Sequence, residues 1–299
     1  MSLRERLASG GFAVTAEISP PRGASTSTIT ATAESLRDWV DAVNVTDNQG
    51  SNVRLASWAG SLAVLKTGLE PVMQMTCRDR NRIALQSDLL GASALGIRNI
   101  LVMTGDHPKF GDHPGARPVF DLDSVQLLWT LRTMRDEHVL LSGRQLDPAP
   151  DCFLGAVENP FAPPVPFRAE RLGKKVAAGA QFVQTQFVFD VAVFAGWMER
   201  VRDQGLHERC AILAGVGPVR SQRALAHLAT IPGVVIPDHV TERLSGLSPD
   251  QLRAEGEKLC SEIIAGLADV PGVAGVHVMA IGAESAIPGI IAQAGLPGR

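Results

Sequence analysis

The alternation of strand-like and helix-like segments predicts an α/β protein, a single (β/α)₈ TIM barrel over residues 1–299. Three observations support this fold class. Short runs of aliphatic and β-branched residues alternate with longer stretches of helical periodicity. Most runs are continuously apolar, which is typical of parallel strands buried on both faces. Eight pairs of strand and helix need about 250 residues or more, and the chain of 299 residues is long enough for them. A doubly wound open sheet is the competing architecture.

Eight segments have the composition of buried strands. In chain order they are Phe12–Ser19, Ala42–Asp47, Pro71–Cys77, Asn99–Gly105, Cys152–Asn159, Phe182–Asp190, Ala211–Gly217 and Val276–Gly282. Parallel strands of one sheet are joined by right-handed crossovers, which the intervening helices supply. No linker-like tract of Ser, Pro and Gly divides the chain, so we expect one domain.

Helical periodicity occupies the segments between these strands. The predicted helices are Ser51–Gly68, Arg80–Leu95, Leu122–Glu137, Phe167–Ala178, Val191–Gln204, Ser221–Ala229 and Ser248–Ala268. The last begins with Ser248, Pro249 and Gln251, a capping-box pattern with proline at the first helical position. Four irregular segments are predicted as long loops: His107–Pro118, Ser142–Asp151, Asn159–Pro166 and Ile231–Leu247.

Charge and composition exclude several classes of protein. Lys and Arg number 28 against 31 Asp and Glu, so the chain lacks the basic balance of a dedicated nucleic-acid binder. A hydrophobic content of 45% excludes disorder. No window approaches the roughly 18 apolar residues that span a bilayer, and no secretory signal begins the chain. The four cysteines are far apart in the sequence, which predicts free thiols. We therefore expect a cytoplasmic protein with no membrane or nucleic-acid partner.

Polar residues at the strand ends are the candidates for chemistry, because barrel active sites lie there. Glu17 lies inside an apolar strand, where a carboxylate is costly unless it is paired or used. It could form a salt bridge, to Arg22 or a lysine, or act as an acid or base. Asp106 follows Gly105 after the fourth strand. It could project into the barrel mouth or cap the following loop.

Two further features invite an interpretation. The loop beginning at Gly105 repeats Gly-Asp-His-Pro, but a proline after each histidine argues against metal binding, so we expect no metal site. A backbone cradle for a ligand or a plain surface loop fits better. Lys174 and Lys175 form either a solvated helix face or, with Arg168 and Arg171 nearby, an anion site. Walker A, Rossmann and G-x-S-x-G motifs are absent.

Six motifs in order resemble the methylenetetrahydrofolate reductase family. They are Glu17 with Pro20-Pro21-Arg22, Val45-Thr46, Thr76-Cys77-Arg78-Asp79-Arg80-Asn81, Thr104-Gly105-Asp106, Pro118-Val119-Phe120-Asp121-Leu122, and Lys174-Lys175 followed by Gln184-Thr185-Gln186-Phe187. The similarity runs from about Leu3 to about Ile290. The stretch Cys77–Leu90 most resembles the branch found in acetogens and in bifunctional proteins.

The resemblance implies a barrel that binds FAD, takes hydride from NADH or NADPH, and reduces 5,10-methylenetetrahydrofolate to 5-methyltetrahydrofolate for methionine supply. It assigns Glu17 to the acid that assists ring opening and protonates the pterin at N5, and Asp106 to the group that stabilises the cationic substrate. It assigns Gln186, together with the two acids, to folate binding. The implied cofactor contacts are Thr46, Gln74, Thr104, Gly105, Asp106, Phe120, Val157, Lys174 and Lys175.

Several positions depart from the family pattern. Gln74 stands where many bacterial members have His, Thr104 where they have Arg, and Val157 where an aromatic residue is usual. The chain has no tyrosine to stack on a flavin. Reduction without flavin, a pterin-binding methyltransferase and a non-catalytic folate-binding subunit are therefore the alternatives. A homo-oligomer or a partner subunit of the methyl branch is also compatible with the sequence.

Overall fold

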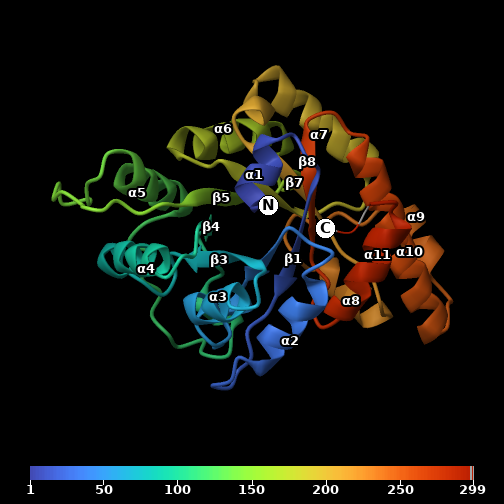
Figure 1. Ribbon diagram of the computed structural model, residues 1–299. Coiled ribbons are helices and arrows are strands. Elements are labelled where there is room, and N and C mark those ends of the chain that lie inside the picture. The colour runs from blue at the N-terminus through green and yellow to red at the C-terminus, as the bar shows by residue number, and fades with distance from the viewer. Residues whose placement is uncertain (297, 299) are drawn as a thin grey trace.

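Eight parallel strands form a closed barrel in the computed structural model, which describes residues 1–296 and 298. The strands are β1 Ala13–Ile18, β2 Ala42–Val45, β3 Glu70–Thr76, β4 Asn99–Met103, β5 Phe153–Glu158, β6 Phe182–Phe187, β7 Ala211–Val216 and β8 Val273–Val278. Each pairs with the next, and β8 returns to β1 (Figure 1). The predicted (β/α)₈ barrel is confirmed, and the open sheet is excluded.

Helices surround the barrel, and α1 covers one end of it (Figure 1). The α-helices are α1 Leu3–Ala8, α2 Ser27–Leu36, α3 Ser57–Leu65, α4 Arg82–Ala94, α5 Ser124–Asp136, α6 Arg168–Ala178, α7 Val191–Asp203, α8 Gln222–Leu228, α9 Asp238–Leu244, α10 Pro249–Ala268 and α11 Ile287–Gln293. Short 3₁₀ turns are η1 Gln49–Ser51, η2 Pro108–Phe110, η3 Val165–Phe167, η4 Leu206–Glu208 and η5 Glu284–Ala286. No helix in residues 1–296 is long and apolar enough to cross a membrane.

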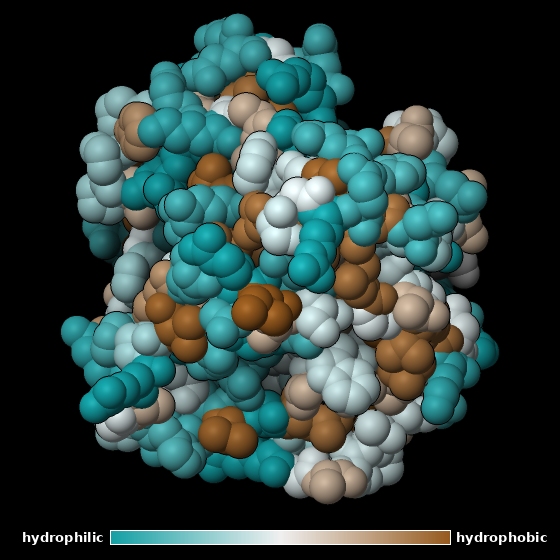
Figure 2. All heavy atoms as spheres, turned by 90° about the vertical axis from the view of Figure 1, so that its left-hand side faces the viewer, coloured by the Kyte–Doolittle hydropathy of each residue, from teal (hydrophilic) through white to brown (hydrophobic). Residues whose placement is uncertain are grey.

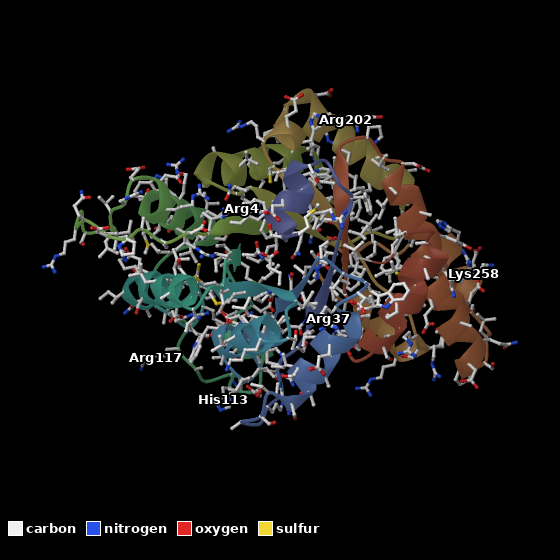
Figure 3. The ribbon with its side chains drawn as sticks, viewed as in Figure 1. Arg4, Arg37, His113, Arg117, Arg202 and Lys258 are labelled. Carbon is white, nitrogen blue, oxygen red and sulfur yellow. The ribbon has the colours of Figure 1, made fainter. Side chains whose placement is uncertain are left out.

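The inside of the barrel is apolar at the end covered by α1. Its buried side chains are Leu3, Ala13, Ala42, Val72, Leu101, Phe153, Phe182 and Leu213. The rings of Phe153 and Phe182 stack with centroids 5.1 Å apart. Arg4 of α1 lies over the ring of Phe153 and pairs with Asp151 at 3.2 Å (Figure 3). This closed, apolar floor restricts polar chemistry to the opposite end.

A larger apolar core fills the space between the strands and the helices. The outer surface is mainly hydrophilic on the side that carries α4 and α5, with apolar side chains scattered over it (Figure 2). Ile83 on α4 and Trp129 on α5 are exposed there. Charged side chains such as Arg202 and Lys258 lie around the periphery (Figure 3).

The predicted helix Ser51–Gly68 is wrong at its start, since α3 begins only at Ser57. Ser51 has a positive φ of 59°, which ends the preceding 3₁₀ turn. The backbone N–H of Val53 then donates to the Asp112 carboxylate instead of to a helical carbonyl. Contacts with a distant loop therefore override the local helical pattern.

Two other predictions also need correction. The predicted loop Ile231–Leu247 contains α9, whose Val240 and Leu244 are fully buried four residues apart. The predicted strand Val276–Gly282 begins earlier, with β8 starting at Val273. Gly275 interrupts the apolar pattern but suits this position, because a Cβ there would lie 2.2 Å from the Ala13 carbonyl oxygen.

Candidate active site

A cavity of about 490 Å³ opens at the carboxyl ends of the strands. Many of the predicted site residues line it: Glu17, Gln74, Thr104, Gly105, Asp106, Val157, Lys175 and Gln186. Arg168 and Arg171, which were expected near an anion site, also line it, as do Asn44, Gln49, Gln184 and His277, for which the sequence predicted no role. Its size is in the range of small-molecule sites. The topology thus brings residues from seven strands, all except β7, to one place.

Glu17 lies on the floor of this cavity and is only 7% exposed. Gln49 Nε2 donates to its Oε1 at 3.2 Å, and Gln74 Nε2 donates to its Oε2 at 3.1 Å. Within the described chain its single ion-pair partner is His277, whose Nε2 lies 3.8 Å from Oε2. The expected alternative of a salt bridge to Arg22 or a lysine does not occur. Two amide donors and one imidazole surround the carboxylate.

A layer of hydrogen-bonded polar side chains continues from Glu17 across the barrel. His277 Nδ1 lies 3.0 Å from Thr15 Oγ1, to which Gln184 Nε2 also donates at 3.1 Å. Gln184 and Asn44 exchange two amide hydrogen bonds, of 2.6 and 3.0 Å. Because each of these four side chains hydrogen-bonds to the next, the layer fixes the His277 ring beside Glu17.

Asp106 reaches the cavity from the loop after β4. Its carbonyl accepts hydrogen bonds from Ser51 Oγ at 2.8 Å and from Arg78 Nη1 at 3.3 Å. Its exposed carboxylate has no hydrogen-bond or ion-pair partner among residues 1–296. Asp106 therefore presents an unpaired negative charge at the mouth, held in place through its backbone.

Arg78 joins the loops that follow β2, β3 and β4. It is 2% exposed and donates to the Asn48 carbonyl and to Ser51 Oγ, in addition to the Asp106 carbonyl. Asp79 balances its charge with two bonds of 2.8 Å. Burial opposes ionisation of Asp79, but the Arg78 hydrogen bonds and charge outweigh it and lower the pKa of Asp79.

The wall formed by β5 and α6 contains a buried ion pair. Lys175 Nζ lies 2.8 Å from Glu158 Oε2 and 2.5 Å from the Val157 carbonyl oxygen. Burial lowers the pKa of Lys175, and the neighbouring Glu158 charge acts in the opposite direction. Arg171 lines the same wall, is exposed, and has no partner in the described part of the chain. Arg171 is thus better placed than Lys175 to meet an anionic ligand.

Three residues that the resemblance assigned to the cofactor lie outside this cavity. Lys174 Nζ stacks over the ring of Phe167 at 5.0 Å. Thr46 is fully buried, and its Oγ1 has no hydrogen-bond partner among the residues that the structure describes. Phe120 packs against the outer core. Gln186, in contrast, lines the cavity; its Oε1 accepts from the Phe187 N–H, so its amide NH₂ remains available to a ligand.

The repeated Gly-Asp-His-Pro loop has a structural explanation. His113 Nδ1 lies 2.9 Å from Asp112 Oδ1, and Asp112 accepts the Val53 N–H. His113 and Arg117 lie at the edge of the molecule (Figure 3). Residues 1–296 contain no group of three or more His, Cys, Asp and Glu that could hold a metal ion. The second half of the repeat ties two mouth loops together.

His277, Gln49, Asn44 and Gln184 are site residues to which the sequence analysis gave no role. For His277 a signal was available, since it is a polar residue within an apolar strand, the same signal that identified Glu17. For Gln49 none was available, because its segment was expected just outside a helix. Its position depends on the turn that precedes α3.

The fold and the cavity define a (β/α)₈-barrel protein with a ligand site at the carboxyl ends of its strands. A family model described as methylenetetrahydrofolate reductase matches residues 2–295. The chain therefore belongs to the methylenetetrahydrofolate reductase family. Assignment to the acetogen-like branch stays a prediction.

Curated relatives are similar over much of the chain. A probable methylenetetrahydrofolate reductase (NADPH) of Caenorhabditis elegans is 26% identical over 231 residues, covering 77% of this chain and 33% of the relative. The 5,10-methylenetetrahydrofolate reductase of Pectobacterium carotovorum subsp. carotovorum is 28% identical over 185 residues, covering 62% and 56%. This chain thus spans about a third of the length of the first relative and over half of the second.

A solved structure shares the fold over nearly the full length. It is an uncharacterized protein from Clostridium thermocellum that binds two copies of 5-methyl-5,6,7,8-tetrahydrofolic acid. The TM-score is 0.70 at 13% identity, covering 98% of this chain and 97% of that chain. At this level of identity the likeness concerns the fold alone.

Proposed function

We propose that this chain reduces 5,10-methylenetetrahydrofolate to 5-methyltetrahydrofolate with NADH or NADPH as the electron donor. The observation that carries the proposal is the buried Glu17 carboxylate, held by two amides on the floor of the strand-end cavity. Membership of the family supports it. So does the methyltetrahydrofolate that the structural neighbour binds. The four free cysteines support a cytoplasmic setting.

The reaction adds a hydride to the bridging carbon and a proton to the nitrogen that departs from it. In this proposal Glu17 holds that proton, because a general acid must reach the departing atom directly or through one water and Glu17 lies on the cavity floor. Asp106 supplies negative charge where the cationic iminium form develops. Gln186 offers its amide NH₂ to the pterin. The two carboxylates differ as these roles require, one buried and hydrogen-bonded and the other exposed and unpaired.

FAD is the cofactor that family membership implies, and part of the cavity suits it. Leu101, Met103 and Val157 give an apolar surface for a ring, with Thr104 beside them. The unpaired Arg171 suits a diphosphate. When bound, FAD would take hydride from the nicotinamide and pass it to the folate. The protein's own contribution is to orient the ligands and to supply protons.

Direct hydride transfer without flavin is the second candidate. It is favoured by the lining of the cavity, which among residues 1–296 includes no Phe, Trp or Tyr to stack on a flavin. The Lys175 side chain is also engaged by Glu158 and the Val157 carbonyl rather than free for a cofactor. The two candidates are distinguished by the absorption spectrum of the purified protein and by activity measured with and without added FAD.

The decisive experiment measures methyltetrahydrofolate formed from methylenetetrahydrofolate and NAD(P)H, with and without FAD. We expect product from the unaltered protein and a fall of about 10²-fold or more in Glu17→Gln. Glu34→Gln, an exposed carboxylate on α2, is the matched control and should keep full activity. If the unaltered protein forms no product under either condition, the proposed function is wrong. Methyl transfer to a corrinoid would then identify a methyltransferase.

A further inference from the structure

His277 and Glu17 form an isolated titratable pair on the cavity floor. His277 is 3% exposed and projects from β8, while Glu17 projects from the adjacent β1. The other titratable residues that line the cavity are Asp106, Glu158, Arg168, Arg171 and Lys175. None of these five lies within ion-pair distance of Glu17 or His277. The side chains that hydrogen-bond to the pair from β1, β3 and η1 are neutral: Thr15, Gln74 and Gln49.

The hydrogen bonds around Thr15 indicate where the His277 hydrogens lie. Thr15 Oγ1 accepts from Gln184 and lies 3.4 Å from the Val276 carbonyl, to which it donates. When the Thr15 hydrogen is used in this way, Thr15 Oγ1 can accept only from a protonated His277 Nδ1, which lies 3.0 Å away. In that tautomer His277 Nε2 faces Glu17 Oε2 at 3.8 Å, so one further proton on either atom would give imidazolium with carboxylate or imidazole with carboxylic acid.

We infer that His277 supplies Glu17 with the proton that Glu17 delivers to the departing folate nitrogen. The inference rests on the proposed function and adds to it the source of the proton. The N–H bond at His277 Nε2 breaks and the O–H bond at Glu17 Oε2 forms. Glu17 then passes this proton to the folate nitrogen. A proton from water in the open cavity restores the imidazolium.

The geometry sets one requirement on this transfer. The two atoms are 3.8 Å apart, whereas a hydrogen bond needs about 2.9 Å, so the carboxylate must move by roughly 1 Å. Both groups that hold it, Gln49 and Gln74, are flexible side chains that can follow such a movement. The imidazole is held more firmly, between Thr15 and the strand that carries it.

The test compares His277→Gln and His277→Asn with the unaltered protein in kcat, KM and their pH dependence. The Gln amide can replace Nε2 and the Asn amide can replace Nδ1, but neither can carry a proton to Glu17. We expect kcat to fall about 10- to 100-fold in both variants near neutral pH, with KM for the folate changed less than about twofold. The kcat of both should also decline from a lower pH than that of the unaltered protein, because Glu17 must then hold the proton alone.

The inference is overturned if His277→Gln keeps the unaltered kcat and pH profile, since His277 would then act only as a hydrogen-bond donor. It is also overturned if only KM changes. The ¹⁵N spectrum of the ring provides a readout without turnover: Glu17→Gln should shift its nitrogens toward neutral imidazole, and Glu34→Gln should not. If the unaltered protein makes no product but Glu17→Gln still shifts the ring nitrogens, the proposed function is contradicted. The pairing of His277 with Glu17 is then still supported.

Discussion

At the level of single residues, the buried pair of Lys175 and Glu158 shapes the site without offering its charge to a ligand. Their side chains are 5% and 1% exposed. Glu158 Oε1 also accepts the Asn159 N–H, and Lys175 donates to the Val157 carbonyl. Burying such a pair costs desolvation free energy. Removing one partner costs more, because the other then becomes an uncompensated buried charge. Its effect is to fix α6 against the end of β5.

We expect Lys175→Met to destabilise the protein by about 3 kcal/mol, because Glu158 loses its 2.8 Å partner and keeps only Arg168, which lies 3.8 Å away. The double variant Lys175→Met with Glu158→Leu should recover much of that loss, since the buried carboxylate is gone and Arg168 keeps its hydrogen bonds to the Ala162 and Pro163 carbonyls. Urea unfolding followed by circular dichroism measures both values. A single variant as stable as the unaltered protein would contradict this expectation and show that Arg168 or water compensates the Glu158 charge. Lys174→Met, which removes an exposed neighbour, is the control and should change stability by less than about 0.5 kcal/mol.

The same lysine gives a prediction for pH. Burial lowers the pKa of Lys175 below its ordinary value of 10.5, so above the folded-state pKa the unfolded chain binds more protons at this site. The free energy of unfolding contributed by Lys175 therefore rises as pH increases toward 10.5. We expect the unaltered protein to gain stability relative to Lys175→Met over this range. Urea midpoints of both proteins at several pH values test the sign; a relative loss would contradict it.

Some candidate site residues could be predicted from the sequence and others could not, for physical reasons. Glu17 could be found because a carboxylate within an apolar strand is unusual, and Asp106 because it follows a strand end. The engagement of Lys175 by Glu158 could not, since residues 17 positions apart meet only through the packing of α6 on β5. Whether Lys174 or Arg171 faces the cavity likewise depends on the rotation of α6. Sequence spacing alone does not set that rotation.

At the level of elements, α1 closes the barrel opposite the cavity. Leu3 is fully buried among the inward-facing residues of the strands, and its N–H donates to Glu70 Oε2 at 2.6 Å. Ser2 and Glu5 form a capping box that begins the helix. Six residues make a helix too short to be stable alone, so its contacts with the barrel hold it in place.

We expect Leu3→Ala to lower the free energy of unfolding by about 3 kcal/mol, because it opens a cavity in a closed apolar floor. Leu7→Ala, which removes a half-buried side chain of the same helix, should cost roughly half as much. Thermal or urea unfolding of the two variants measures the difference. Activity at the opposite mouth should be retained where the variants are folded. Equal effects of the two substitutions would show that α1 does not close the floor.

The predicted elements failed where distant contacts decide the local conformation. Val53 donates to Asp112 across two loops, so the helix expected from Ser51 starts later. In α9 the apolar pair Val240 and Leu244 was present in the sequence, but seven residues give too little periodicity to distinguish a helix from a loop. The eight strands were recovered because burial on both faces leaves a strong, continuous apolar signal.

At the level of the whole molecule, barrel closure links distant parts of the chain. The first and last strands pair directly, so residues more than 250 positions apart share one hydrogen-bond ladder and one site. The contact between Glu17 and His277 is a consequence of this closure. A sequence reading could assign each strand but not the register between β8 and β1, on which that contact depends.

The four cysteines report on this closure, because they lie in separate parts of the barrel and are all buried. Burial raises the pKa of Cys77, Cys210 and Cys260 to about 12 and that of Cys152 to about 11. The thiolate is the reactive form, so the folded protein should react very slowly with thiol reagents at about pH 8.

In urea all four thiols should become reactive at one urea midpoint, the same as the midpoint of the circular dichroism signal. A single midpoint is expected because the loss of one strand leaves both of its neighbours unpaired. Single-cysteine variants resolve the four sites. If Cys260 on α10 reacted at lower urea than Cys77 after β3, the C-terminal helices would unfold as a separate unit.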